Sequence, residues 1–245
     1  MAPGDKFCER CGLAQPAGRD RIELNVGDAA GISDRGRHHY RNEDALAIRA
    51  GERLIAVVCD GVSTSDRPDE AARLAADTAA DVLSGGGSTK DAVGAAAEAV
   101  AALAPGTVEP PACTYVSAVL TGDEVRIGWV GDSRAYWLGE TECRLLTEDD
   151  AVGHVLTAWL GADAGEVAPR ELTLTPAEPG TVLLCSDGLW NYLGEARELR
   201  DHLRTAPSPA AAAAGLVRYA NDQGGHDNIT VVLLPFPPAT TRSAS

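Results

Sequence analysis

Short apolar runs, many of them ending in a polar or turn residue, recur along most of this chain and are typical of β-strands. The runs ALAIRA and RLIAVVCD flank the dipeptide Gly51-Glu52, which predicts a hairpin. The runs CTYVSAVL, EVRIGWVGD and RAYWLG are joined by short turns and predict a meander of three consecutive strands. Two later runs, at 181–187 and 228–236, predict the last strands.

Longer stretches in which apolar residues recur with helical spacing separate these strands. The first covers residues 63–87, with Ser65 or Asp66 as its cap and three glycines at its end. The second, 88–106, has its own Ser/Thr cap and a Pro-Gly stop, and two more follow at 195–205 and 208–222. Because two consecutive helices precede strands joined by short turns, the pattern favours an antiparallel α+β fold over a doubly wound parallel sheet.

Composition and charge exclude several classes of protein. The chain has 245 residues, of which 44% are hydrophobic and 23% charged, as in ordinary globular domains. Its net charge of -15 argues against a partner nucleic acid or an anionic membrane, since both attract a basic surface. Without an apolar run long enough for a membrane span or a signal peptide, we expect a cytoplasmic protein. Its six cysteines are then expected to remain thiols.

The first twenty residues differ from the rest. They are polar and contain CERCG, in which Cys8 and Cys11 have the spacing of one knuckle of a zinc ribbon. A structural zinc site needs four ligands, so three alternatives remain open: an unpartnered half site, zinc shared with another chain or an upstream segment, or a redox pair. We predict an N-terminal segment at 1–20, a folded domain at 21–236 and a disordered tail at 237–245.

Five aspartates stand at strand ends or in the turns beside them: Asp44, Asp60, Asp132, Asp187 and Asp227. Three have a small or polar turn residue as their neighbour, namely Gly61, Gly188 and Asn228. One such aspartate is commonly only a turn residue. If several met at one point, their repulsion would be on the order of several kcal/mol, and they would coexist ionised only around divalent cations. Oxygen ligands of this kind select Mg²⁺ or Mn²⁺.

Six motifs occur in a known order: SDRGRHHYRNED, CDGVSTS, GDSRAYWL, LTEDD, CSDGLW and GGHDNITVVLL. This set resembles the metal-dependent serine/threonine protein phosphatases of type 2C, the PPM family, including its bacterial members. The resemblance covers residues 22–235. It implies a four-layer α-β-β-α sandwich, in which two antiparallel sheets are flanked by helix pairs and a binuclear metal centre lies at one end.

The resemblance also implies a role for each aspartate. Asp60 would bridge two Mn²⁺ or Mg²⁺ ions, with Asp187 and Asp227 on the first ion. The carbonyl of Gly61 would bind the second ion, with Asp44 near it, mainly through water.

Two further residues complete the implied site. Asp132 would hold a weaker third ion together with Asp187, and Asn228 would orient Asp227. A metal-bound hydroxide would then attack phosphorus directly, with no covalent phosphoenzyme. None of the six cysteines has an arginine six positions later, so the chain has no cysteine-based phosphatase loop.

The phosphate-binding position departs from the family. The family places an arginine five residues before the aspartate of Asn-Glu-Asp, and this chain has His39 there. If His39 binds phosphate, affinity should fall as pH rises, because only the imidazolium is charged. Arg41 or Arg37 could take this role after a shift in register, or the residues could form a plain surface cluster.

Two more departures concern the leaving group and the substrate. Val62 follows Gly61 where animal members have a histidine proposed as general acid, so a metal-bound water or His39 would have to serve. The long flap of bacterial members is missing, since Thr147 and Gly161 are joined almost directly. We predict a flap-deleted variant with an open cleft and weak discrimination among substrates. His226, beside Asp227, is interpreted as a turn residue.

The leading hypothesis is a cytoplasmic signal-transduction enzyme that hydrolyses phosphoserine and phosphothreonine in proteins and opposes a Ser/Thr kinase. One alternative is a non-catalytic phosphatase-like module that binds phosphoproteins or a regulatory partner. The other is a phosphatase of small phosphoesters.

Overall fold

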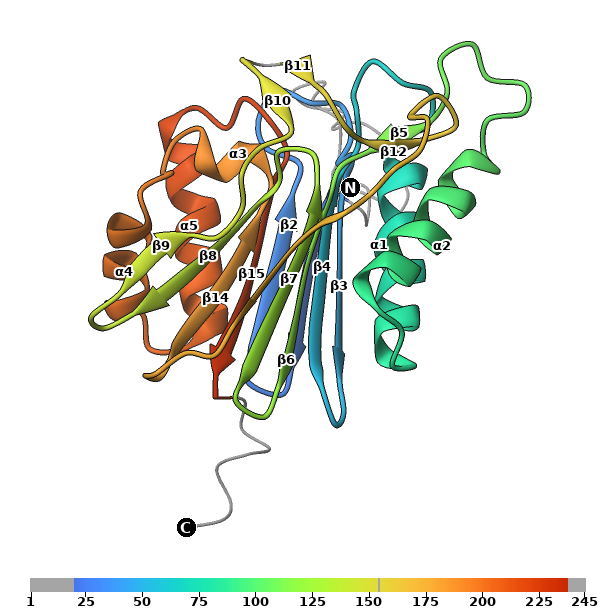
Figure 1. Cartoon of the computed structure of the whole chain (residues 1–245). Coiled ribbons are helices and arrows are strands. Elements are labelled where there is room, and N and C mark those ends of the chain that lie inside the picture. Colours follow the sequence, from blue (N-terminus) through green and yellow to red (C-terminus); the bar gives the residue numbers. More distant parts are fainter. Residues whose placement is uncertain (1–19, 154, 238–245) are drawn as a thin grey trace, which may run out of the picture.

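The computed structural model describes residues 20–153 and 155–237. Two antiparallel sheets lie face to face, and helices cover the outer face of each (Figure 1). The first sheet has the order β1 (Arg21–Val26), β2 (Ala29–Asp34), β15 (Ile229–Phe236), β14 (Gly180–Cys185), β8 (Arg134–Gly139), β9 (Cys143–Leu145). The second has the order β13 (Arg170–Leu174), β7 (Glu124–Val130), β6 (Tyr115–Thr121), β4 (Leu54–Asp60), β3 (Asp44–Ala50).

Three apolar layers hold the sandwich together. The middle layer lies between the sheets and joins Val58 and Ile127 of one sheet to Trp137 and Val232 of the other. One outer layer packs α1 (Pro68–Ser84) and α2 (Thr89–Ala101) on the second sheet. The other packs α4 (Ala196–Arg204) and α5 (Pro209–Gln223) on the first sheet. The expected four-layer α-β-β-α architecture is confirmed.

Helix α1 contacts β3 and β4 through alanine. Its buried positions include Ala71, Ala72, Ala75, Ala76, Ala79 and Ala80, all 0–1% exposed. This spacing places them on one face of the helix, and small side chains there let the helix backbone approach the sheet closely.

The two helix starts differ. At α2 the expected cap is confirmed, because Ser88 and Asp91 form a reciprocal capping box. At α1 the expected cap is wrong: Arg67 occupies the cap position with a left-handed backbone, and no side chain caps the helix. The hydroxyl of Ser65 instead accepts from the Ala112 amide, and the Asp66 carboxylate accepts from the Val108 amide at 2.8 Å.

The expected meander is also wrong in part. Strands β6 and β7 pair as expected, but β8 pairs with β14 and β9 in the other sheet. The chain therefore crosses between the sheets at residues 131–133. This crossing places Asp132 at the end of the sandwich where both sheets contribute loops.

Short strands lie at the same end (Figure 1). They form the pairs β10 (Ala151–Val152) with β11 (Val155–Leu156), and β5 (Ala112–Cys113) with β12 (Leu160–Gly161). Helix α3 (Asp187–Trp190) completes the elements. Across the described ranges, no helix combines the length and apolar character that crossing a bilayer requires.

The cysteines fall into two groups. Cys59, Cys113 and Cys185 are buried free thiols, and Cys143 is a partly buried one. The predicted knuckle of Cys8 and Cys11 and the predicted tail after residue 237 lie outside the described residues.

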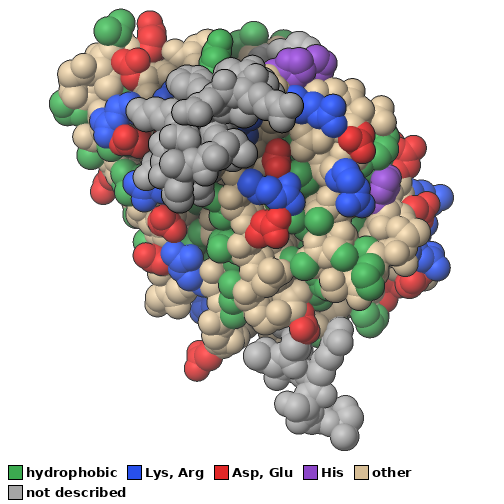
Figure 2. All heavy atoms as spheres, turned by 180° about the vertical axis from the view of Figure 1, so that it is seen from behind, with side chains coloured by type: hydrophobic (Ala, Val, Ile, Leu, Met, Phe, Trp, Pro, Cys, Tyr) green, Lys and Arg blue, Asp and Glu red, His purple; other side chains and the backbone are tan. Residues whose placement is uncertain are grey.

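On the face shown in Figure 2, acidic and basic side chains are interspersed rather than gathered by sign.

Candidate metal centre

The second sheet brings two aspartates together directly. Asp44 begins β3, Asp60 ends β4, and the antiparallel register places them opposite each other. The Gly61 amide then donates to the Glu43 carbonyl at 3.2 Å, so the contact between these two chain segments extends one residue beyond Asp44 and Asp60. A Cβ at Gly61 would lie 2.5 Å from the carbonyl oxygen of Pro68 at the start of α1. Only glycine allows this close approach between the turn and the helix.

The first sheet supplies two more aspartates from neighbouring strands. The end of β14 pairs with the start of β15, with Cys185 opposite Val231. Asp187 follows β14 and Asp227 precedes β15, so both lie at the same sheet edge. A Cβ at Gly188 would overlap the carbonyl oxygen of Asn228. Glycine is therefore required where the turn after Asp187 meets the turn after Asp227.

The fifth aspartate is held by the crossing segment. The carbonyl of Asp132 accepts from the Trp190 indole at 3.0 Å. The Arg134 guanidinium lies 3.8 Å from the centre of the Trp190 ring and donates twice to Asp149, at 3.0 and 2.7 Å. These contacts join the crossing to α3 and to the segment after β9.

The five aspartates form one acidic cluster, consisting of Asp44, Asp60, Asp132, Asp187 and Asp227. Burial first, and then the charges of the four others, raise the pKa of Asp60 well above its usual range. Burial, with the charge of Asp227 next, raises the pKa of Asp187 to about 8. Burial likewise raises the pKa of Asp44 to about 6, although hydroxyl hydrogen bonds lower it. The carboxylates thus interact strongly enough to disfavour one another's ionised forms.

Two oxygen atoms of the cluster are buried without a hydrogen-bond partner: Oδ1 of Asp44 and Oδ1 of Asp187. Buried carboxylate oxygens of this kind are costly unless something positive compensates them. A hard divalent cation accepts such oxygens as ligands, so the residues fit Mg²⁺ or Mn²⁺. In the rotamers shown, no three acidic, cysteine or histidine side chains of the described residues converge on one point as a metal site.

The other oxygen of Asp44 accepts two hydroxyl hydrogen bonds. Ser186 and Thr230 each lie 2.7 Å from Asp44 Oδ2, and Asp44 itself is 5% exposed. Sequence reasoning missed both hydroxyls, although each lies within a few residues of an aspartate in the motifs CSDG and DNIT. Side-chain direction at a strand end depends on the facing sheet, so the motifs alone did not reveal the contact.

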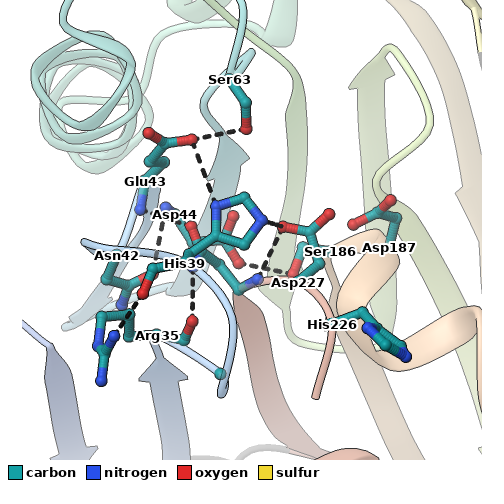
Figure 3. Close-up of polar contacts among 12 residues, drawn as sticks. Arg35, His39, Asn42, Glu43, Asp44, Ser63, Ser186, Asp187, His226 and Asp227 are labelled. Atoms are coloured by element: carbon teal, nitrogen blue, oxygen red, sulfur yellow. Dashed lines mark hydrogen bonds and ion pairs between the residues drawn. The ribbon is translucent and has the colours of Figure 1, made fainter. Parts of the chain in front are cut away.

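His39 lies at the edge of the acidic cluster, between Glu43 and Asp227 (Figure 3). Its Nε2 is 3.1 Å from Asp227 Oδ1, and its Nδ1 is 3.9 Å from Glu43 Oε2. Its carbonyl oxygen accepts a hydrogen bond from the Arg35 guanidinium. His39 is therefore held both by its backbone and by its ring.

The other cationic candidates point to different partners. Arg41 contacts Glu43 at 3.0 Å and Asp69 at 3.4 Å. Arg37 pairs with Asp222 of α5 at 3.0 Å. The carboxylate of Glu43, which sequence reasoning did not single out, also accepts the Ser63 hydroxyl at 2.6 Å.

Asn228 acts on Asp227 through its backbone. Its amide donates to Asp227 Oδ1 at 2.8 Å. Its side chain instead joins the loop before β3 to β15: Oδ1 accepts from the Glu43 amide, and Nδ2 donates to the carbonyls of Arg35 and Arg41. This holds the His39 loop beside Asp227.

His226 lies in the loop before β15. Its ring stacks on His38 with centroids 4.6 Å apart, and its amide donates to the Tyr192 hydroxyl. Figure 3 shows its ring turned away from the acidic cluster.

Comparison with known proteins gives a family match over most of the chain. Residues 35–223 match the model of the family described as Protein phosphatase 2C. The serine/threonine phosphatase stp of Listeria welshimeri is 36% identical over 141 residues, covering 49% of this chain and 55% of that protein. The serine/threonine protein phosphatase PstP of Mycobacterium tuberculosis is 30% identical over 235 residues, covering 83% of this chain and 44% of that protein. The chain thus spans about half the length of these relatives.

Solved structures show the same fold. The PPM Ser-Thr phosphatase MsPP from Mycobacterium smegmatis, in complex with cacodylate, has a TM-score of 0.72 at 25% identity, covering 86% of this chain and 98% of that chain. The catalytic domain of the phosphatase PstP, in complex with two manganese ions, has a TM-score of 0.67 at 25% identity, covering 84% and 96%. In both cases nearly the whole related chain is matched.

Proposed function

This chain belongs to the protein phosphatase 2C family, and on that premise we propose that it is a metal-dependent phosphatase of phosphoserine and phosphothreonine in proteins. The observation that carries the proposal is the acidic cluster, with its two unpartnered buried oxygens on Asp44 and Asp187. The Listeria and Mycobacterium relatives named as serine/threonine phosphatases support it.

The acidic cluster is the proposed site of two divalent cations. Asp60, Asp187 and Asp227 would hold the first, and Asp60 with the Gly61 carbonyl would hold the second, with Asp44 close by. Asp132 and Asp187 would hold a weaker third. The two manganese ions of the PstP structure support the number of ions, and Mg²⁺ is the other candidate. Such a pair supplies a water nucleophile of lowered pKa and positive charge against the phosphoryl oxygens.

The surrounding residues would hold and orient these groups. Ser186 and Thr230 fix the rotamer of Asp44 through one carboxylate oxygen and leave the other free. The backbone amide of Asn228 orients Asp227. His39, held 3.1 Å from Asp227, is the side chain that we assign to the substrate phosphate. Val62 has no proton to donate to the leaving alkoxide, so His39 or a metal-bound water would be the donor.

We infer that the short hairpin of β10 and β11 is what remains of a flap. We further infer a cytoplasmic role in signal transduction opposite a Ser/Thr protein kinase. A zinc ion at Cys8 and Cys11 stays a prediction, which a zinc assay of the purified protein and of Cys8→Ser would test. Finding no zinc, or equal zinc in the two proteins, would contradict it.

Hydrolysis of a phosphothreonine peptide, with and without Mn²⁺, tests the proposal. The wild type should require Mn²⁺. Asp187→Asn should lose more activity than the roughly 10–100-fold loss that is typical when a residue hydrogen-bonded to a metal ligand is replaced. Asp123→Asn, an exposed aspartate in the β6–β7 turn, is the matched control and should retain activity.

The result can also favour the alternatives. A folded wild type that binds Mn²⁺ but hydrolyses no peptide would support a non-catalytic phosphoprotein-binding module. Faster turnover of small phosphoesters than of peptides would support a metabolite phosphatase.

A further inference from the structure

A hollow of about 430 Å³ opens beside the acidic cluster. One wall is the turn that follows Gly61, from Val62 to Ser65. The rest of the lining comes from β11 (Val155 and Leu156), from Trp159 and Asp163 in the segment after it, and from Glu109, Pro110 and Ala112. Its larger lining side chains include Val62, Glu109, Val155, Leu156, Trp159 and Asp163.

The hollow shares one lining residue, Ser63, with a second hollow that contains His39. The second hollow has a volume of about 500 Å³, and Glu43 lines it as well. Ser63 is three residues after Asp60, so their Cα atoms are at most about 11 Å apart. An extended peptide covers that distance in about three residues. A phosphoresidue at the acidic cluster would therefore place a side chain up to about three positions away in the hollow.

The lining combines apolar and acidic side chains. Val62 lines the hollow, at the position where animal members of the family have a histidine proposed as general acid. Val155 is 69% exposed, and Trp159 is partly exposed with its indole donating to Asp163 at 3.0 Å. Exposed apolar side chains grouped around a cavity commonly mark a binding site. Glu109 and Asp163 add negative charge.

Both walls are held before any ligand arrives. The buried Asp150 donates its amide to the Gly131 carbonyl and its carboxylate pairs with Arg170 at 2.8 Å, while its carbonyl accepts from the Thr157 amide at 2.8 Å. The hairpin is therefore attached to the segment that carries Asp132. On the other side, Ser65 and Asp66 hold residues 108–112. Because the hollow is preformed, a ligand can bind without the free-energy cost of ordering its walls.

We propose that this hollow receives a bulky apolar side chain of the substrate, within about three residues of the phosphoresidue and next to a Lys or Arg. The apolar side chain would lie against Val62 and Trp159. The basic neighbour would face Glu109 and Asp163. The proposal rests on the proposed phosphatase function. In place of the weak discrimination among substrates expected from the sequence, the enzyme would prefer an apolar residue at one position of the substrate.

A set of phosphothreonine peptides tests the proposal. Each carries Leu or Ser at one position from three before to three after the phosphothreonine, with Lys next to it. The wild type should prefer Leu at one of these positions by about 10-fold or more in kcat/KM, in the range that an apolar contact provides. In Trp159→Ala this preference should fall toward one. Val62→Thr keeps the side-chain shape and should lower the preference as well, if the Trp159 variant does not fold.

Matched measurements separate the causes. Val108→Thr replaces an exposed valine that does not line the hollow, and it should keep the wild-type preference. In a second pair of peptides, Lys or Glu stands next to the Leu, and the wild type should have the higher kcat/KM for the Lys peptide. Glu109→Gln should weaken only this preference for Lys over Glu. If Trp159→Ala and Val62→Thr both kept the wild-type preference for Leu over Ser, the hollow would not bind this side chain and the proposal would be overturned. Because p-nitrophenyl phosphate has no flanking residues, its Mn²⁺-dependent hydrolysis shows separately whether a variant keeps the metal-dependent phosphatase chemistry, and hydrolysis of the phosphothreonine peptides themselves tests the proposed function.

Discussion

The carboxylate of Asp227 accepts the Asn228 amide and contacts the His39 ring at the same oxygen. The basic side chains near it differ in their partners. Arg41 pairs with Glu43 and Asp69, and Arg37 pairs with Asp222, whereas His39 contacts Asp227 of the acidic cluster as well as Glu43. At the residue scale, the structure therefore favours His39 over the arginines as the contact to phosphate.

Substitution of these side chains gives a direct comparison. His39→Asn should raise KM for a phosphothreonine peptide by roughly 10-fold, because a charge-assisted hydrogen bond to phosphate would be lost. Arg41→Gln should raise KM less, and Arg37→Gln least. Steady-state kinetics at saturating Mn²⁺ measure all three. A larger rise in Arg41→Gln would give the phosphate contact to Arg41 and contradict the assignment.

At the scale of elements, the site depends on close contacts between turns. The turn after β14 and the turn before β15 touch at Gly188 and Asn228, where a Cβ has no room. The Asn228 side chain then binds the loop before β3. Three segments far apart in sequence are thereby held within one hydrogen-bond network.

Two glycine-to-alanine substitutions test this contact. Gly188→Ala should destabilise the fold by on the order of 3 kcal/mol, because backbone atoms would have to move, and it should weaken Mn²⁺ binding. Gly94→Ala is the control: Gly94 lies in the middle of α2, and a Cβ there would have nothing within 4 Å, so alanine should stabilise by about 0.5–1 kcal/mol. Urea unfolding measures both. A Gly188→Ala protein as stable as the wild type would show that the turns separate without cost.

At the scale of the whole molecule, four carboxylates of the acidic cluster, Asp44, Asp60, Asp132 and Asp187, oppose folding when no cation is bound. Their folded-state pKa values lie above those of an unfolded chain, at about 6 for Asp44 and about 8 for Asp187. These groups keep their protons in the folded protein where an unfolded chain has lost them. Their contribution to stability is therefore full at acid pH, below about 4, and is lost as pH rises through 6 to 8.

Thermal unfolding at several pH values checks this expectation. In EDTA, Tm should fall by several degrees between pH 5 and pH 8.5, and Mn²⁺ should restore it most at the higher pH. Asp187→Asn should flatten the slope in EDTA, whereas Asp123→Asn should keep it. A metal-free Tm that is constant or rises over this range would contradict the strong interaction among the carboxylates.

Local pattern was enough to predict much of the fold. The β3–β4 hairpin, the cap of α2 and the α+β class follow from periodicity and turn chemistry, which depend on residues close in sequence. Two expectations failed where distant segments intervened. Strand β8 left the expected meander for the other sheet, and Ser65 and Asp66 bound residues 108–112 instead of capping α1.

The sequence by itself determined that aspartates stand at the strand ends and that the motifs resemble one phosphatase family. Only the tertiary structure decided that Asp44 and Asp60 lie opposite each other, that Ser186 and Thr230 bind Asp44, and that Trp159 and Val62 face one hollow. The physical reason is range. Periodicity and turn preference are set by neighbours within a few residues. The direction of a side chain at a strand end is set by contacts with segments far away along the chain, as with Asp44 and Ser186, which are 142 positions apart.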